Sequence, residues 1–361
     1  MQTRNLAVGV PDPVRHGNDY LDHVSHAKPG IKVFPDVLYV ICVISNPCRY
    51  RTRYELYRAF EKHMEESGAI LYTVEMAYGG RPFEITEANN PYHIQLRSDK
   101  ELWFKENMIN IGISRLPSDW KYVAWIDADT MFVRPDWVQE TIHQLQHHKF
   151  VQMFSQVQNV DSNYRPISAH HSVGFVYNWH HNIWINIGKD KKTDYPYACF
   201  CEDEVLNIWK WYGPPGGAWA AQRDAIDEVG GVIDVGILGS GDVYMASALI
   251  GELKFNLQKG LTKEYVRHLS IWEERATLHI RRNIGYVDGL MIHYWHGSFK
   301  NRGYETRNEI LIRHKFNPDI DLKRDWQGLW QLVDHGEERS VALRDKIRGY
   351  FRRRQEDLQS S

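Results

Sequence analysis

Residues 37–44 read Val-Leu-Tyr-Val-Ile-Cys-Val-Ile, an unbroken apolar run that follows a polar N-terminal region. A run of this length predicts a strand that is buried on both faces, as in a parallel sheet. After a polar turn, residues 52–66 have the apolar spacing of an amphipathic helix, and Gly68 ends it. The apolar residues 69–74 predict a second strand. This strand–helix–strand unit predicts an α/β fold with a parallel sheet.

The same alternation of strands and helices continues along the chain, although residues 150–235 give mixed patterns around a Gly/Pro cluster at 213–217. From residue 317 onward we expect a peripheral helical segment. The remaining expected elements are, in order, a helix at 99–116, a strand at 122–126, a helix at 137–147, a helix at 240–250 and a strand at 288–294.

Composition sets broad limits on the protein class. The 361 residues are 43% hydrophobic and 25% charged, an ordinary balance for a soluble globular protein. That length is enough for one large α/β domain or two small ones. The formal net charge of −2 does not by itself indicate a polyanionic partner.

The cysteines and the N-terminus indicate an intracellular, cytoplasmic protein. The four cysteines do not have the spacing of a zinc site, and we expect reduced thiols at Cys42, Cys48, Cys199 and Cys201. The first 26 residues lack the apolar region of a signal peptide, and no apolar run has the length of a membrane span.

An acidic pair follows the third predicted strand directly. Asp127 and Asp129 are two residues apart, so in an extended segment both carboxylates point the same way. Ligands of open α/β sheets bind beyond the carboxyl ends of the strands. Carboxylate oxygens suit Mg²⁺ or Mn²⁺, with substrate phosphates completing the coordination. We therefore expect a metal on Asp127 and Asp129; the alternative is an aspartate pair that only stabilises a turn or caps a helix.

At this point the sequence resembles a known class. Trp125-Ile-Asp-Ala-Asp-Thr-Met-Phe132 is similar to the DxD segment of glycosyltransferases with the GT-A type fold, and Ala128 is its middle residue. Trp103-Phe-Lys-Glu-Asn-Met-Ile-Asn110 resembles the helix that precedes this segment. The resemblance implies a Rossmann-like, mostly parallel sheet flanked by helices. It also implies a metal-bound nucleotide-sugar diphosphate, with Ala128, Lys105 and Asn110 among the donor contacts; Lys105 and Asn110 would equally suit a solvated helix face.

In this fold the nucleoside of the donor lies over the ends of the first two strands. A carboxylate there can accept hydrogen bonds from ribose or base groups, and arginines can bind phosphate oxygens. For the arginines the alternative is an ordinary surface charge. The implied donor contacts are Ser45, Asn46, Arg49, Glu75, Arg81 and Arg97. UDP is the commonest donor nucleotide of the class and is our default.

Two glycine-rich segments resemble the second half of such enzymes. The loop 213–217 leads into Trp219, and by resemblance Gly217 and Trp219 line the sugar pocket; otherwise they form a structural turn with a core tryptophan. The stretch 230–242 ends in Asp242 at the start of a helix. In inverting GT-A enzymes such an acid is the general base, although a helix N-cap explains it as well. Asp234 is the second candidate base.

His293-Tyr-Trp-His296-Gly-Ser-Phe-Lys300 follows the last expected strand. Several GT-A families place a metal-binding histidine here, and some follow it with Gly-x-x-Lys on the diphosphate. By resemblance His296 or His293 is a metal ligand and Lys300 a donor contact. Imidazole suits Mn²⁺ better than Mg²⁺. The alternative is a pair of histidines at a strand edge.

The basic stretch 344–354 favours a solvated helix face, with a polyanionic acceptor such as modified DNA as the other interpretation. We expect an N-terminal arm (1–35), a GT-A domain (36–315) with a donor half (36–135) and an acceptor half (136–315), and a basic helical extension (316–361). The expected function is transfer of a hexosyl or pentosyl group to an acceptor hydroxyl of a glycan or of modified DNA. A nucleotidyltransferase, or an inactive carbohydrate-binding protein of this fold, is the alternative.

Overall fold

The apolar run 37–44 forms β1 (Leu38–Ser45), the first described strand of the chain, which lies fifth in the order across a seven-stranded sheet. The protein is described here by a computed structural model, which covers residues 36–178, 200–203, 208–211, 214–304 and 306–359. Residues 37–361 belong to one compact unit. The strand order across the sheet is β12 (Ile284–Tyr286), β6 (Phe150–Gln152), β11 (Ala218–Gln222), β4 (Tyr122–Ile126), β1 (Leu38–Ser45), β2 (Ile70–Tyr78) and β3 (His93–Ser98).

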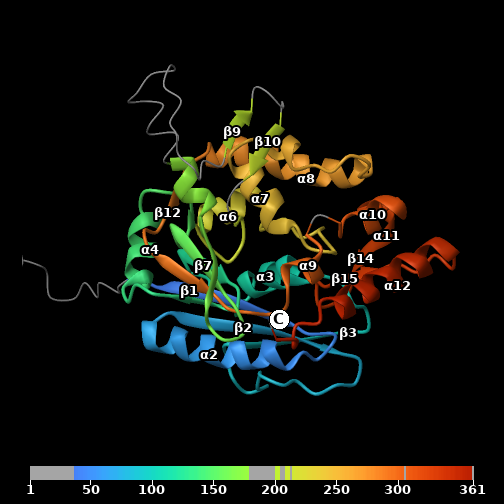
Figure 1. Ribbon diagram of the computed structural model, residues 1–361, viewed down its shortest axis with the longest axis horizontal. Coiled ribbons are helices and arrows are strands. Elements are labelled where there is room, and N and C mark those ends of the chain that lie inside the picture. Colours follow the sequence, from blue (N-terminus) through green and yellow to red (C-terminus); the bar gives the residue numbers. More distant parts are fainter. Residues whose placement is uncertain (1–35, 179–199, 204–207, 212–213, 305, 360–361) are drawn as a thin grey trace, which may run out of the picture. The chain divides into compact units, whose positions relative to one another are not determined.

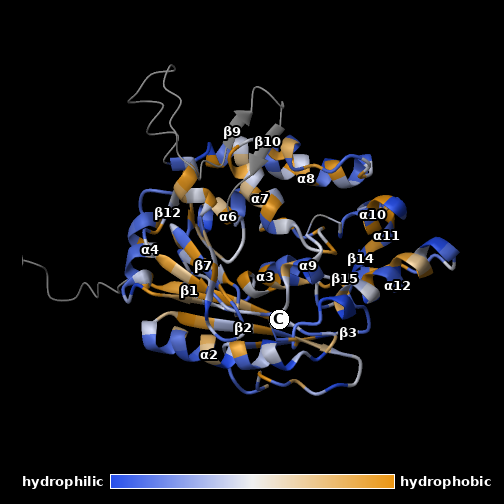
Figure 2. Ribbon diagram, in the orientation of Figure 1, coloured by the Kyte–Doolittle hydropathy of each residue, from blue (hydrophilic) through white to orange (hydrophobic). Residues whose placement is uncertain are grey.

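Strand β1 is buried on both faces, as its composition predicts. Its alternate residues Val40 and Cys42 point into one apolar cluster, and Ile41 points into the other. Helices α2 (Arg51–Ser67) and α4 (Trp137–Leu145) cover the first face. On the other face lie α3 (Lys105–Ile113), α6 (Arg223–Val229), α7 (Gly241–Leu249) and α8 (Lys263–Arg275). Figure 2 shows apolar residues along β1 and β2 between these helices.

The strand–helix–strand unit forms as expected. Strand β1 pairs in parallel with both β2 and β4, and β2 pairs in parallel with β3. Gly68 ends α2 in the left-handed conformation at φ 77°. The predicted α/β class, with a mostly parallel sheet flanked by helices, is confirmed (Figure 1).

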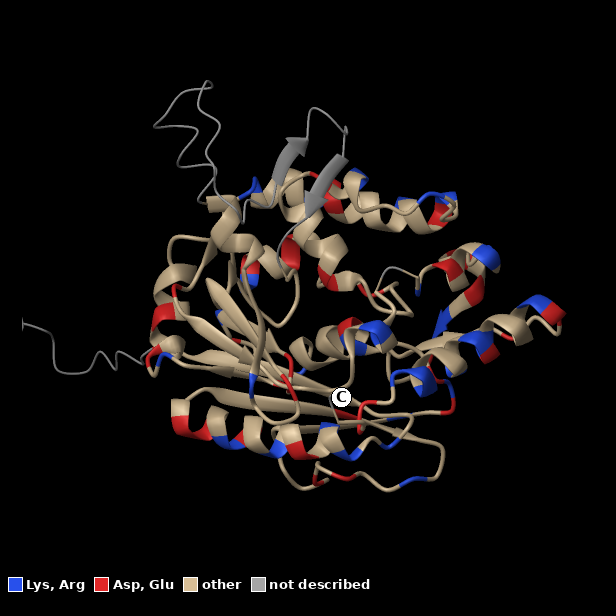
Figure 3. Ribbon diagram, viewed as in Figure 1, with Lys and Arg blue, Asp and Glu red and all other residues tan. Residues whose placement is uncertain are grey.

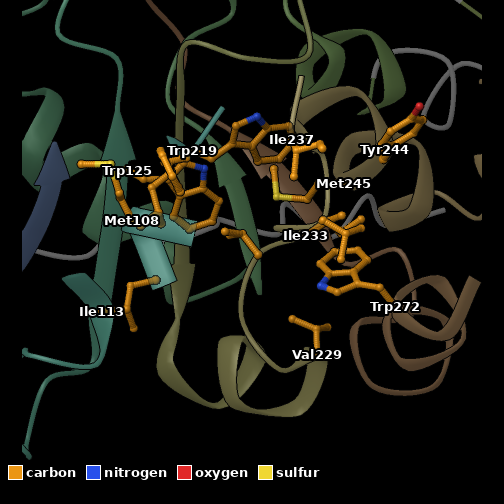
Figure 4. Close-up of a cluster of buried hydrophobic side chains, with 14 of the residues drawn as sticks. Met108, Ile113, Trp125, Trp219, Val229, Ile233, Ile237, Tyr244, Met245 and Trp272 are labelled. Carbon is orange, nitrogen blue, oxygen red and sulfur yellow. The ribbon is translucent and has the colours of Figure 1, made fainter. Parts of the chain in front are cut away.

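The two antiparallel pairings within the large sheet were not expected. Strand β11 lies between β4 and β6 and runs antiparallel to both. Trp219 of β11 faces Trp125 of β4, and Figure 4 shows both side chains in the core with Met108, Met245 and Trp272. These last three come from α3, α7 and α8. The helices on this face therefore pack on an apolar layer that β11 helps to build.

A second sheet of four strands lies after the acidic pair, in the order β5 (Thr130–Phe132), β13 (Leu290–His293), β7 (Gln156–Val160) and β8 (Pro166–His171). Strands β13 and β5 are antiparallel, with His293 opposite Thr130. The next backbone amide, that of Tyr294, donates to the carbonyl of Asp129 at 2.8 Å. This pairing joins segments more than 160 residues apart and brings the histidine motif to the acidic motif.

The segment expected as a helical extension also contains strands. It contributes α11 (Pro318–Asp321), the two-stranded sheet of β14 (Leu322–Arg324) and β15 (Trp330–Leu332), and α12 (Glu338–Arg353). Helix α12 buries Leu343, Ile347 and Tyr350 in the larger core, while its Lys and Arg residues lie along the helix in Figure 3.

The remaining described elements are short. None of the helices in the described ranges is long and apolar enough to cross a membrane. Cys42 and Cys48 are free thiols; Cys199 and the side chain of Cys201 lie outside what is described. The remaining elements are β9 (Phe200–Asp203), β10 (Ile208–Trp211), η1 (Leu253–Phe255), η2 (Ala276–Ile280), α9 (Phe299–Arg302) and α10 (Glu309–Arg313).

Candidate active site

A cavity of about 1000 Å³ lies beyond the carboxyl ends of β1 and β4. Such a position is the general ligand site of open α/β sheets. Apolar groups and a dense set of charged groups share its lining. The acidic and basic lining residues are Arg53, Lys105, Glu106, Asp127, Asp129, Asp242, Arg302, Arg307, Arg354 and Glu356.

Asp129 and two histidines converge on one point of this lining. Asp129 Oδ2 is 3.0 Å from His296 Nδ1, and Asp129 Oδ1 is 3.7 Å from His293 Nε2. One potential ligand atom from each residue lies within 4.8 Å of the other two. Asp129 Oδ1 is buried and accepts no hydrogen bond from the described residues. One carboxylate and two imidazoles with an unsatisfied oxygen are a suitable donor set for a divalent cation.

Neighbouring groups hold His293 and Asp129 of this triad in the protonation states that suit metal coordination. Burial lowers the pKa of His293 to about 3, so its imidazole is neutral at pH 7. Its Nδ1 lies 2.7 Å from Asn159 Oδ1, while the Asn159 amide nitrogen donates to Ser168 Oγ, so Nδ1 carries the proton and Nε2 faces Asp129. Burial alone would raise the pKa of Asp129, but His296, and then His293, hold it well below its usual range. The carboxylate is therefore ionised.

Asp127, the other member of the acidic pair, has a different partner. Its Oδ1 is 2.6 Å from Lys105 Nζ, at the start of α3. Burial raises the pKa of Asp127 although Lys105 opposes this effect. Burial would lower the pKa of Lys105, but Asp127 and then Asp242 raise it above its usual value. The two form an ion pair in the cavity wall, and Asp127 is not part of the Asp129–histidine triad.

Asp242 reaches the cavity from the first turn of α7. Ser240, the residue before the helix begins, has φ 74°, which turns the chain into α7. A Cβ at Gly216 would overlap Asp242 Oδ2, so the glycine-rich loop and the carboxylate are in direct contact. Behind them, burial raises the pKa of Glu106 to about 8. Glu106 is therefore mostly protonated at pH 7, and Asp242 is the second acid at this wall.

Several of the site residues expected from the sequence line the cavity. Besides the Asp127–Lys105 pair and Asp129, the expected residues that line it are Ser45, Ala128, Gly217, Asp242, His293 and His296. Ser45 Oγ is 2.7 Å from the Tyr78 hydroxyl. Gly217 has φ 91° and its carbonyl accepts from the amide of Asp127 at 2.8 Å. The loop thus touches the acidic motif directly.

The residues expected over the nucleoside, apart from Ser45, lie outside this lining and make local contacts. Glu75 is buried and accepts from the amides of Glu84, Ile85 and Thr86, so it holds that loop. The other contacts are Asn46 with the backbone of Tyr50, Arg49 with Glu84, Arg81 with the Pro47 carbonyl, and Arg97 with the carbonyls of Gly79 and Arg81.

Four further expected residues also lie outside the lining. Asp234 forms an ion pair with Arg324 at 2.7 Å, and Asn110 hydrogen-bonds the backbone of Val232 on both sides. Trp219 is a core residue whose indole donates to the Pro215 carbonyl. Lys300 is exposed on α9.

Sequence reasoning missed the arginines of the site. Arg53, Arg302, Arg307 and Arg354 line the cavity, together with Glu356. Arg302 stands two residues after the lysine of the Gly-x-x-Lys pattern, which is the one local signal that could have drawn attention to it. Arg53 comes from α2 and Arg307 lies just before α10, and no short motif marks either of them. Arg354 ends the basic stretch 344–354, interpreted above as a solvated helix face or as a contact for a polyanionic acceptor.

No protein-family model matches the chain, and no curated protein matches it. Solved structures with some likeness include the Drosophila beta1,4galactosyltransferase 7 catalytic domain in complex with xylobiose (10% identity, 62% of this chain and 63% of that one, TM-score 0.29). A mutant of that enzyme in complex with manganese, UDP-Gal and xylobiose has 10% identity over 85% of this chain and 98% of that one, with a TM-score of 0.35. A proposed nucleotide-diphospho-sugar transferase from Desulfovibrio desulfuricans has 10% identity over 78% of this chain and 99% of that one, with a TM-score of 0.30. At these values the likenesses carry no inference about ligand or reaction, so any function must be argued from the site itself.

Proposed function

We propose that the protein is a metal-dependent glycosyltransferase that uses a nucleotide-sugar donor, with UDP as the default nucleotide. The observation that carries the proposal is the triad of Asp129, His293 and His296 beside a large cavity at the carboxyl end of β4. A site for phosphate-bearing ligands needs cations and an open face, and arginines and Lys105 line the same cavity.

In this proposal Asp129, His293 and His296 hold a divalent cation. When bound, such a cation neutralises charge that develops on a departing diphosphate. Two imidazoles among three protein ligands favour Mn²⁺ over Mg²⁺. Asp127 and Lys105 then bind the donor beside the metal site, since their ion pair offers both a carboxylate acceptor and an ammonium donor to hydroxyl and phosphate groups.

We assign the general base to Asp242. It lines the cavity together with the triad and reaches it from a different element, α7. A carboxylate there can take the proton of an acceptor hydroxyl, which favours inversion at the sugar carbon. Asp234 is less suited to this role because Arg324 and two asparagines occupy its carboxylate outside the cavity lining.

Features of the sequence and of the same cavity argue against other functions. Two histidines and one carboxylate also suit non-haem iron, but the arginine-rich wall favours a phosphate-bearing ligand. A nucleotidyltransferase usually has a glycine-rich basic loop after its first strand, which residues 45–49 lack. An inactive binding protein would not need Asp242 opposite the glycine loop. The acceptor hydroxyl, of a glycan or of modified DNA, is part of the proposal.

A panel of nucleotide-sugars tests the proposal by thermal shift with and without Mn²⁺. A ligand at about a hundred times its Kd stabilises the folded state by about 2.7 kcal/mol. We expect UDP-sugars to raise the unfolding temperature more when Mn²⁺ is present than when it is absent. If no UDP- or GDP-sugar shifts the transition under either condition, the proposed function is wrong.

A further inference from the structure

One wall of the cavity is built from four buried or partly buried arginines, of which two lack a carboxylate in direct contact among the described residues. Arg53 and Arg354 both bind Glu356: Arg53 Nε lies 2.5 Å from Oε2 and Arg354 Nε 2.5 Å from Oε1. Arg302 and Arg307 are only 2% and 5% exposed, and neither forms an ion pair with a described carboxylate. Glu356 is therefore the described carboxylate in direct contact with this group of arginines, while Asp129 and Asp242 act on Arg302 and Arg307 from a greater distance.

Arg302 is held with one donor left over. Its Nη2 donates to the Gly297 carbonyl at 3.1 Å and its Nη1 to the Tyr304 hydroxyl at 3.2 Å. Its Nε is buried and has no hydrogen-bond partner among the described residues. Gly297 directly follows the triad residue His296, so this unused donor belongs to the same part of the cavity wall as the metal ligands.

Arg307 is held by neutral groups on the other side of Tyr304. Its Nε and Nη2 donate to Ser240 Oγ at 3.2 and 2.9 Å, and its guanidinium lies 5.1 Å from the Tyr304 ring centroid. Ser240 precedes α7, the helix that carries Asp242. Arg302 thus contacts the hydroxyl of Tyr304 and Arg307 lies over its ring, so one tyrosine links the two arginines.

Buried cations without a counter-charge are costly to keep in a folded protein. Hydroxyl and carbonyl oxygens accept hydrogen bonds from the guanidinium groups of Arg302 and Arg307, but they do not neutralise the positive charge. An arginine fork matches the oxygens of phosphate groups, and these are the anions that would complete such a wall.

We propose that Arg302 and Arg307, supported by Arg354, form an oxyanion subsite that binds phosphate groups independently of the metal. This rests on the proposed function only for the identity of the ligand. The phosphate groups come either from the leaving diphosphate of the donor or from an anionic acceptor. Arg302, rather than the exposed Lys300, is then the cation that follows the histidine–glycine motif on the ligand.

The test uses inorganic pyrophosphate as the probe, with the full chain, EDTA and low ionic strength. Isothermal titration should show binding to the wild type without metal. We expect Arg302→Gln and Arg307→Gln each to weaken it by roughly tenfold or more, since each removes a charge-assisted hydrogen bond. Arg313→Gln is the matched control, because that exposed arginine pairs with Glu309 on α10 and is not among the described residues that line the cavity; the affinity of this variant for pyrophosphate should be unchanged.

Arg302→Lys covers the case in which a buried glutamine prevents folding, because it keeps the charge and loses the fork; we expect intermediate affinity. Thermal unfolding establishes that each variant is folded. Failure of the wild type to bind pyrophosphate without metal, or equal affinity in all folded variants, would overturn the subsite.

Two further arms separate the sources and the two proposals. If Mn²⁺ with UDP displaces pyrophosphate, the leaving diphosphate occupies the subsite; if both bind together, an anionic acceptor group does. Pyrophosphate binding without any nucleotide-sugar binding would contradict the proposed function and leave the subsite standing. If nucleotide-sugar binding is unchanged in the Arg302 and Arg307 variants, the proposed function stands and the subsite is contradicted.

Discussion

Asn159 shows how a residue outside the triad prepares it. Its side-chain oxygen accepts from His293 Nδ1 at 2.7 Å and so turns Nε2 toward Asp129. Partners of this kind fix the tautomer and the orientation of a metal-binding histidine.

Removing this partner should weaken metal binding without unfolding the site. We expect Asn159→Ala to lower Mn²⁺ affinity by about 10- to 100-fold, measured by titration. Asn163→Ala is the control, because that side chain lies in an exposed turn of the same hairpin. An Asn159→Ala affinity equal to the wild type would show that His293 is not held in this way.

Gly216 tests the placement of Asp242. An alanine there would push on Asp242 Oδ2, and displacing a catalytic group by about 1 Å can cost about a hundredfold in rate. We therefore expect Gly216→Ala to lower kcat by one to two orders of magnitude while Mn²⁺ binding stays normal. Gly80→Ala is the control, since nothing lies within 4 Å of a Cβ added there. If kcat is unchanged in Gly216→Ala, Asp242 is not the base.

At the scale of elements, the end of the chain stabilises the start of α2. No side chain of the helix caps its own N-terminus; Asp357 instead accepts from the amides of Arg51 and Thr52 at 3.0 and 2.9 Å. Tyr50 also donates to the Phe351 carbonyl at 2.8 Å. The segment after α12 is therefore joined to the same end of β1 and α2 that borders the cavity.

Removing this cap should destabilise the whole unit. Asp357→Ala is expected to lower the free energy of unfolding by about 0.5 to 2 kcal/mol, as loss of a helix cap does. Urea denaturation measures it, with Asp345→Ala as the control because that exposed aspartate pairs only with its neighbour Arg344. Equal unfolding midpoints for the two variants would contradict the capping role.

A second contact between elements should make stability depend on pH. Asp321 ends α11 and binds Arg339 of α12 at 2.6 Å. Burial would raise the pKa of Asp321, but Arg339 and the Asn317 amide lower it below its usual value. A carboxyl whose pKa is depressed by folding contributes stability above its unfolded-state pKa of about 3.9 and loses it as the pH falls through the folded-state value.

Asp321→Asn should therefore be less stable than the wild type by about 2 kcal/mol at pH 7. The gap should close as the pH is lowered below about 4. Urea denaturation across this range, with Asp345→Asn as the control, measures the gap. A gap that stays constant with pH would show that the ionised Asp321 does not stabilise this contact.

At the scale of the whole molecule, local patterns were enough for the first half of the fold. The run at 37–44, the helix after it and Gly68 lie within one strand–helix–strand unit, so their spacing alone predicts it. Asp127 and Asp129 could be placed at a ligand site because they follow a buried strand directly. The antiparallel strand β11 and the β5–β13 pairing depend on contacts between distant segments, which one sequence does not reveal.

The same reason explains the errors of emphasis in the site. Glu75 has the position of a ligand-binding acid, but three backbone amides and the Thr86 hydroxyl already occupy it. Arg53 and Arg354 are 301 residues apart and meet only through Glu356. The net charge of −2 likewise gives no sign that four arginines gather at one cavity.

In the proposed function, Asp129, His293 and His296 hold the metal on which sugar transfer depends. The most direct measurement is release of nucleotide diphosphate from a nucleotide-sugar at saturating Mn²⁺, in the wild type, in Asp129→Ala and in Asp136→Ala. Asp136 is an exposed partner of Arg134 and serves as the control. We expect the wild type and the control to release nucleotide diphosphate until the metal is chelated, and Asp129→Ala to release none. Undiminished release by Asp129→Ala would contradict the proposed function.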